Sequence, residues 1–254
     1  MFNKRIIGRL DIKSNLLIKG IRMEGWKKIG DPVDFAKKYY EFGIDELILL
    51  DVVASLYERN NLTGIISEIA SEVFIPITVG GGIRCLKDVE NLLKAGADKI
   101  TLNTAAVKNP EIIKDISSNF GSQATVLAIE CKRDISSKNW EPLTDNGRNH
   151  THLDAISWAI KAEEMGAGEI FLTSIDHDGT KLGCDLELFK EISCKVKIPV
   201  IGGGGIGSIK DIENLLKSES VDAFAIGSAL HFNDLTLKDI RKIFKDNGFD
   251  IRDI

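Results

Sequence analysis

Short apolar runs and longer stretches with helical spacing alternate along almost the whole chain. The run ELILLD at 46–51 is nearly continuous in apolar character, which is typical of a strand covered on both faces. Such runs predict strands at 5–11, 46–51, 76–79, 98–103, 124–130, 169–175, 199–202 and 222–227. Helical spacing predicts helices at 32–42, 60–72, 86–95, 109–118, 153–165, 185–195, 209–218 and 236–247.

The chain also repeats itself at about half its length. PITVGGGI at 76–83 returns as PVIGGGGI at 199–206, and KDVENLLK at 87–94 returns as KDIENLLK at 210–217. Both pairs are 123 positions apart in a chain of 254 residues. Self-similarity at a fixed spacing indicates one structural unit used twice.

Eight strands, each followed by a helix, predict an α/β fold, a single (β/α)8 barrel over residues 1–254. A doubly wound open sheet is the alternative, but the repeat better suits a closed ring of two similar half-barrels. Asp31, directly before Pro32, predicts the N-cap of the first helix. Residues 14–30 show no period and predict a mobile loop. The polar segment 133–151 predicts a loop or small hairpin after the fifth strand.

Composition and charge narrow the classes of partner. An apolar content of 43% is enough for a large core, and a net charge of −5 gives no reason to expect nucleic acid. The four cysteines show no C-x-x-C spacing, which indicates reduced thiols, with metal binding a minor alternative. No apolar run approaches the ~18 residues of a membrane span. We therefore expect a soluble, cytoplasmic protein without a membrane partner.

Glycine-rich turns stand at two of the strand ends, where the functional residues of such barrels gather. They lie at 80–82 and 202–205, and each is followed one strand later by a small polar pair, Asn103-Thr104 or Gly227-Ser228. The backbone N–H groups of such turns can bind an anion. A single glycine run could be explained by a tight turn alone. Two such runs, each followed by a small polar pair, favour a ligand with a phosphate at both ends.

Two carboxylates complete the candidate site. Asp11 ends the first strand and Glu130 the fifth, so they are expected to face each other across the ring. Between two phosphate sites they could act as general acid and base on a bisphosphorylated substrate. For either one alone, a solvated loop carboxylate is the alternative. His177, His150 and His152 lack further ligands nearby, so we expect no metal site.

Several motifs together carry a family resemblance. They are KRII at 4–7, LD at 10–11, KG at 19–20, GDPV at 30–33, GIDEL at 43–47, VGGGI at 79–83, NTAA at 103–106, FGSQ at 120–123, TSID at 173–176 and DGT at 178–180. Over essentially its whole length the chain resembles the HisF family, the cyclase subunits of imidazole glycerol phosphate synthase.

This resemblance implies an ammonia-using enzyme of histidine biosynthesis without metal or organic cofactor. A HisH-like glutaminase subunit would dock at the bottom of the barrel and release ammonia. The ammonia would pass through the barrel to a bisphosphorylated ribonucleotide at the top. Ammonia addition, ring closure and lyase cleavage would yield imidazole glycerol phosphate and an aminoimidazole carboxamide ribotide.

The resemblance also assigns roles to residues. Asp11 and Glu130 stand at the catalytic positions, and Lys19 at that of a lid cation for phosphate. The phosphate-binding positions are Gly82, Asn103 and Thr104 in one half, and Asp178, Gly179, Gly204, Gly205, Gly227 and Ser228 in the other. The ammonia gate corresponds to Arg5, Glu46, Lys99 and Glu169, and Asp98 matches a glutaminase-interface position. A salt-bridge cluster that serves only stability would use the same four gate residues.

Three departures from the family pattern touch the predicted centre. Glu130 replaces an aspartate, which moves the carboxylate by about one C–C bond. Arg9 replaces a cysteine, and the segments 14–16 and 22–26 differ from the usual lid. A second reading therefore stays open, a HisF-like paralogue that passes ammonia to a sugar-amidating enzyme of surface-polysaccharide biosynthesis. A related phosphosugar isomerase is a third, but it fits the gate less well.

Overall fold

The computed structural model describes residues 4–54, 62–134, 136 and 139–249. The elements in chain order are β1 (Arg5–Lys13), β2 (Leu16–Ile21), β3 (Glu24–Gly30), α1 (Pro32–Glu41), β4 (Glu46–Asp51), α3 (Thr63–Glu72), β5 (Ile77–Gly80), α4 (Leu86–Lys94), β6 (Lys99–Leu102), α5 (Thr104–Lys108), α6 (Glu111–Phe120), the 3₁₀ turn η1 (Ser122–Ala124), β7 (Thr125–Arg133), β8 (Trp140–Thr144), β9 (Asn149–His150), α7 (Ala155–Glu164), β10 (Glu169–Ser174), α8 (Leu186–Ser193), β11 (Val200–Gly203), α9 (Ile209–Ser218), β12 (Ala223–Ile226), α10 (Ser228–His231) and α11 (Leu237–Asp246).

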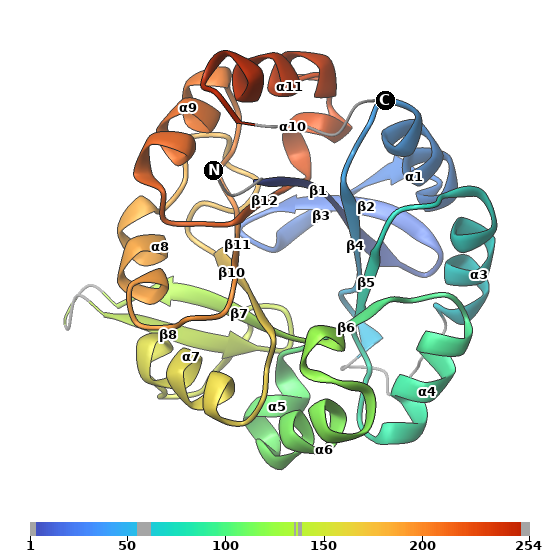
Figure 1. Cartoon of the computed structure of the whole chain (residues 1–254), viewed down its shortest axis with the longest axis vertical. Coiled ribbons are helices and arrows are strands. Elements are labelled where there is room, and N and C mark those ends of the chain that lie inside the picture. Colours follow the sequence, from blue (N-terminus) through green and yellow to red (C-terminus); the bar gives the residue numbers. More distant parts are fainter. Residues whose placement is uncertain (1–3, 55–61, 135, 137–138, 250–254) are drawn as a thin grey trace.

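Eight parallel strands form a closed ring with the helices outside it (Figure 1). The order around the ring is β1, β4, β5, β6, β7, β10, β11 and β12, and β12 pairs again with β1. The predicted (β/α)8 barrel is therefore confirmed, and all eight predicted strands are present. Each predicted helix is also present, although positions 60 and 61 of the helix expected at 60–72 lie outside the described residues.

The prediction of a mobile loop at 14–30 is wrong. The first strand continues past the ring to Lys13, and residues 16–21 and 24–30 add two antiparallel strands to it. Ser14 and Asn15 make the turn with φ of 48° and 64°, as a tight hairpin with the twist of its strands requires. Few apolar side chains mark β3, so its pairing with β2 was not visible as a period. Because β2 pairs with residues 11–13 of β1, the β2–β3 hairpin lies at the C-terminal end of the barrel.

The prediction for 133–151 allowed a loop or a small hairpin, and the structure contains the hairpin. Strand β8 runs antiparallel to β7, and the two residues of β9 pair with β8. Two further elements, α5 and α10, were not predicted, because helices of five and four residues are too short to show a period. They follow β6 and β12, at matching places in the two halves.

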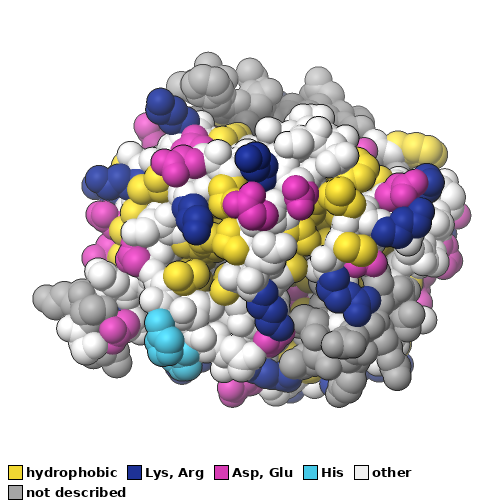
Figure 2. All heavy atoms as spheres, turned by 90° about the horizontal axis from the view of Figure 1, so that it is seen from below, with side chains coloured by type: hydrophobic (Ala, Val, Ile, Leu, Met, Phe, Trp, Pro, Cys, Tyr) yellow, Lys and Arg dark blue, Asp and Glu magenta, His cyan; other side chains and the backbone are white. Residues whose placement is uncertain are grey.

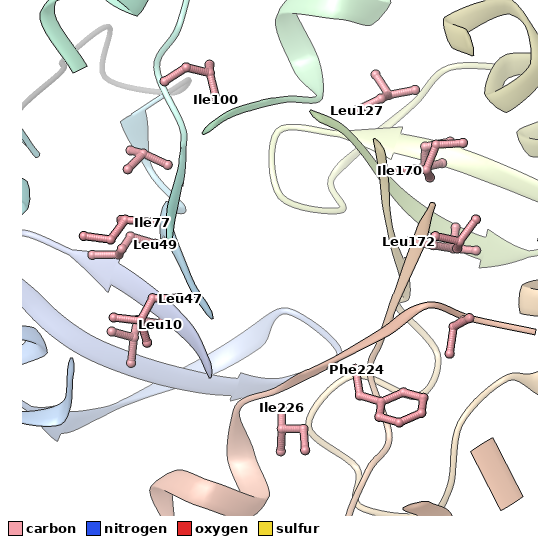
Figure 3. Close-up of a cluster of buried hydrophobic side chains, with 14 of the residues drawn as sticks. Leu10, Leu47, Leu49, Ile77, Ile100, Leu127, Ile170, Leu172, Phe224 and Ile226 are labelled. Carbon is pink, nitrogen blue, oxygen red and sulfur yellow. The ribbon is translucent and has the colours of Figure 1, made fainter. Parts of the chain in front are cut away.

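Apolar side chains fill both sides of the barrel wall. Strand residues that face outward pack beneath the helices, and Figure 3 shows ten of them labelled around the ring, among them Leu10, Leu49 and Phe224. Residues that face inward form a second buried cluster in the barrel interior, including Ile7, Ile48 and Phe171. Alternation along each strand thus divides the core into an outer layer and a lumen.

Helix caps follow from local sequence. The Asp31 carboxylate accepts hydrogen bonds from the Val33 and Asp34 amides, which confirms the predicted N-cap of α1. Helices α4 and α9 both begin with a capping box, Cys85 with Asp88 and Ser208 with Asp211. Because these boxes occupy equivalent positions of the sequence repeat, the repeat is also structural.

The outer surface mixes both signs of charge on the side shown in Figure 2, where lysines and arginines lie among acidic and apolar side chains. The described residues of that face form no single-sign patch of the kind a polyanion would need. None of the described helices is both long and apolar enough to cross a membrane.

Candidate functional site

Four buried charged groups occupy the centre of the upper end of the barrel. The Asp11 carboxylate accepts from Arg9 Nε at 2.8 Å and from Lys19 Nζ at 2.8 Å. Lys19 also donates to both Asp178 oxygens, at 3.0 and 3.1 Å, and Arg9 Nη1 lies 3.5 Å from Asp178 Oδ1. All four residues are at most 6% exposed. Two cations and two carboxylates thus balance, as buried charges must.

The electrostatic state of Asp11 follows from this pairing. Burial alone would raise its pKa, but the Arg9 guanidinium and the Lys19 ammonium outweigh it and hold the pKa well below the usual range. Asp11 is therefore a carboxylate at neutral pH. It can accept a hydrogen bond or stabilise a cation, but it carries no proton to give.

Glu130 has the opposite state. It lies on β7, four strands away from β1 in either direction around the ring, so the two carboxylates stand on opposite walls as predicted. Its Oε2 accepts from Asn103 Nδ2 at 3.0 Å. Burial, helped by the Asp11 and Asp178 charges, raises the pKa of Glu130 to about 7, although the Arg9 charge acts to lower it. Glu130 can therefore both hold and release a proton near neutral pH.

The first-half site is a cavity of about 280 Å³ beside Glu130. Its lining brings together all three residues predicted for this half, Gly82, Asn103 and Thr104, with Gly81 and the cation of Lys108. The Thr104 hydroxyl accepts from the Asp145 amide at 2.9 Å and keeps its own proton for a ligand. Asn103 Oδ1 is buried without a partner within the described residues. This cavity can receive an anionic group.

The second-half site lies across the ring, where the loop after β10, the turn after β11 and the start of α10 meet. It contains every residue predicted for it: Asp178, Gly179, Gly204, Gly205, Gly227 and Ser228. Lys19 and Arg9 also line it, and its free volume is only about 10 Å³. A short helix after the eighth barrel strand is the usual place for a phosphate in this fold. Here the internal carboxylates already satisfy the cations.

The turns of the second-half site depend on glycine. Gly205 has φ of 97°, and a Cβ there would lie 1.9 Å from the Gly183 carbonyl oxygen. We expect Gly205→Ala to lower the free energy of unfolding by about 3 kcal/mol or more, since that carbonyl must move. Gly25→Ala is the matched control, because Gly25 has φ of 61° and nothing within 4 Å of a Cβ. It should cost about 1 kcal/mol in chemical denaturation; equal losses would contradict the steric argument.

A ring of four charges closes the lower end of the barrel. Arg5 pairs with Glu46 at 2.8 Å and with Glu169, and Lys99 pairs with the same two glutamates at 3.1 and 3.0 Å. The structure therefore brings together all four predicted gate residues. Both glutamates are buried, and each oxygen faces a cation. The arrangement is a polar plug at the base of an apolar lumen.

Asp98 lies at the same end of the barrel, with its side chain exposed. Its Oδ2 accepts from the Ile77 amide at 2.8 Å, and Asp222 Oδ2 accepts from the Val200 amide in the same way. Asp98 thus fastens the start of β5. Its place at a partner interface stays a prediction.

Sequence reasoning missed two contributions to the upper end. Arg9 was noticed only as a neighbour of Asp11, whereas its side chain reaches Thr173 on the far wall. His231 was not considered, yet it is buried beside the second-half site with Nδ1 2.6 Å from the Tyr39 hydroxyl, and burial lowers its pKa to about 4. Its position shortly after the Gly227-Ser228 pair in the sequence was the available signal. Across residues 4–54, 62–134, 136 and 139–249, no three His, Cys, Asp or Glu side chains form a metal-holding group.

Comparison with known proteins agrees with this geometry. The model of a family described as "Histidine biosynthesis protein" matches residues 5–236. A protein of Legionella pneumophila named imidazole glycerol phosphate synthase subunit HisF is 56% identical over 211 residues, covering 83% of this chain and 99% of that protein. Proteins of the same name from Leuconostoc mesenteroides and Clostridium botulinum are each 43% identical, over 98% and 99% of this chain and 98% and 100% of their own lengths. The chain therefore belongs to the HisF family of histidine-biosynthesis proteins.

Proposed function

We propose that this chain is the cyclase subunit of an imidazole glycerol phosphate synthase and acts with a HisH-like glutaminase subunit. Its substrate would be a bisphosphorylated aminoimidazole-carboxamide ribulose nucleotide. With ammonia, a lyase reaction would yield imidazole glycerol phosphate and aminoimidazole carboxamide ribotide. The observation that carries the proposal is the pair Asp11 and Glu130 on opposite walls, with an anion site beside each.

The two carboxylates support different roles in this chemistry. Adding ammonia to a carbonyl carbon and then losing water needs a group that can take and return protons. Glu130, with a pKa of about 7, is suited to that exchange, and Asn103 holds its carboxylate in position. Asp11, fixed as an anion, would instead stabilise the positive charge on the nitrogen after attack.

The barrel interior supports delivery of ammonia from below. Thr78 and Thr101 face inward, since their neighbours on each strand belong to the outer core. Both hydroxyls are buried without a hydrogen-bond partner within the described residues. Above the charged plug they stand in an otherwise apolar lumen, where a small neutral hydrogen-bonding molecule such as ammonia can be accommodated.

A substitution in the plug tests its energetic role. Lys99→Met should lower the free energy of unfolding by about 2 kcal/mol, because it leaves Glu46 and Glu169 with a single cation. Turnover with ammonium salt should stay within about twofold, because that ammonia enters from solution and the plug is at the far end. Lys87→Met, which removes an exposed pair with Glu90, is the matched control and should leave the free energy of unfolding nearly unchanged. Equal losses for both variants would contradict a buried plug.

The direct test of the proposal is turnover of the bisphosphorylated substrate with a saturating ammonium salt and no glutaminase. Formation of both products by the unmodified protein would establish the cyclase. If neither product forms with correctly folded protein, the proposed reaction is refuted for this chain. The alternative function, a conduit of ammonia to a sugar-amidating enzyme, would then be favoured. At present the relatives favour the cyclase, because those named above are subunits of imidazole glycerol phosphate synthase.

A further inference from the structure

Arg9 crosses the barrel interior. It starts on β1, and Nη1 lies 3.3 Å from Thr173 Oγ1 on β10. Strands β12 and β11 separate β1 from β10 in the ring, so a side chain that joins them spans the interior rather than following the wall. The guanidinium carbon also lies 5.6 Å from the centre of the Phe171 ring, within cation–π range. Arg9 is 3% exposed, so little space remains around it.

Arg9 lies at the boundary between the apolar lumen and the carboxylates of the upper end. On the inward face of β1, Ile7 lies one step below it and Asp11 one step above. Ile7 and Phe171 belong to the apolar lumen, whereas Asp11 belongs to the catalytic centre. The guanidinium therefore stands between the lumen and the carboxylates, as a closure at the upper end that matches the charged plug at the lower end.

Arg9 and its carboxylate partner Asp178 both line the second-half site. Arg9 and Lys19 share the carboxylates of Asp11 and Asp178, so no positive charge is left over for a ligand. The free volume of about 10 Å³ holds no more than about one water molecule. A phosphate that enters this site must therefore compete with Asp178 for Lys19 and Arg9. A turn of the single Arg9 guanidinium toward the phosphate would draw it away from Asp11, Thr173 and Phe171.

We propose that Arg9 is the upper gate of the lumen, and that the phosphate group of the substrate opens it by entering the second-half site. This inference rests on the proposed function and specifies how its site is regulated. Ammonia that arrives from below would meet the carboxylates only when substrate is bound, which would prevent its loss through an empty active site. Arg9 acts here through its position, and it does not take part in the bond changes.

The Nε–H signal of Arg9 in an NMR spectrum with ¹⁵N-labelled arginine reports the gate without any turnover. In the free protein this proton is buried and bonded to Asp11, so it should exchange slowly with water. Saturating inorganic phosphate should speed its exchange by about tenfold or more. Arg9→Lys, which lacks the signal, assigns it.

Two matched variants locate the effect. Ser228→Val removes a hydroxyl from the second-half site and should move the midpoint of the Arg9 response to higher phosphate concentration. Thr104→Val makes the same change in the first-half site and should leave that midpoint unchanged. Phosphate that binds, by calorimetry, without changing the Arg9 exchange would overturn the proposal, as would phosphate binding confined to the first-half site.

The gate and the cyclase reaction can fail independently of each other. Turnover with ammonium salt but an unresponsive Arg9 would leave the cyclase standing and remove the gate. An Arg9 signal that responds to phosphate in a protein without turnover would keep the gate and refute the reaction.

Discussion

Asp11→Asn is expected to lower kcat with ammonium salt by about 10²–10⁴-fold, because it removes the anion that would stabilise the developing positive charge. It should also lower the free energy of unfolding by about 3 kcal/mol or more, since Arg9 and Lys19 would then share the single carboxylate of Asp178. The pKa of Asp11 is lowered in the folded state, so its stabilising effect is present above the unfolded value near 3.8 and is lost as the pH falls through the folded pKa. Denaturation at pH 7 and steady-state kinetics measure the two effects.

Asp178→Asn is the matched control for Asp11→Asn. It removes the same charge from the same buried cluster, and it should cost a similar amount of stability. Asp178 borders the second-half site rather than the space between the two carboxylates, so its kcat should fall by less than about tenfold. Equal losses of kcat would assign the effect to the cluster as a whole and contradict a specific role for Asp11.

Glu130→Gln is expected to lose activity while gaining stability. Gln keeps an oxygen that can accept from Asn103 but cannot exchange a proton, so kcat should fall by about 10²–10⁴-fold. The wild-type dependence of kcat/KM on pH should show a limb near pH 7, where the carboxyl titrates, and the variant should lack it. Glu130→Asp keeps an ionisable group and should retain a titrating limb, which makes it the control.

The stability change of Glu130→Gln has a defined sign. Burial raises the pKa of Glu130 from 4.5 to about 7, so between these values the folded state binds more protons than the unfolded state. Wild-type stability therefore falls as the pH rises through this window. The variant should be similar to wild type at pH 4 and more stable at pH 8, by about 3 kcal/mol at most. Thermal unfolding of both proteins at both pH values checks this. If the stability difference between variant and wild type is the same at pH 4 and pH 8, the raised pKa is refuted.

Much of the barrel could be predicted because its elements are encoded locally. Strands buried on both faces appear as continuous apolar runs, and helices packed on one side appear as a 3.6-residue period. Asp31 works through its own backbone neighbours, and the turn glycines are marked by the positive φ that their turns need, so residue type and order were enough. The β2–β3 hairpin escaped this reading because β3 has few apolar residues, and both strands are placed by their pairing with one another and with β1.

The sequence by itself determined the ring of strands, the two glycine-rich turns and the chemical types of the proposed catalytic and gate residues. Only the tertiary structure decided their charge states and partners. Lys19 meets Asp178 from 159 positions away, and Arg9 reaches Thr173 from 164, so neither contact has a local signal. Asp11 and Glu130 are both carboxyl groups at strand ends, yet one has a lowered and the other a raised pKa. The reason is physical: burial and neighbouring charge set a pKa, and both exist only once the ring has closed.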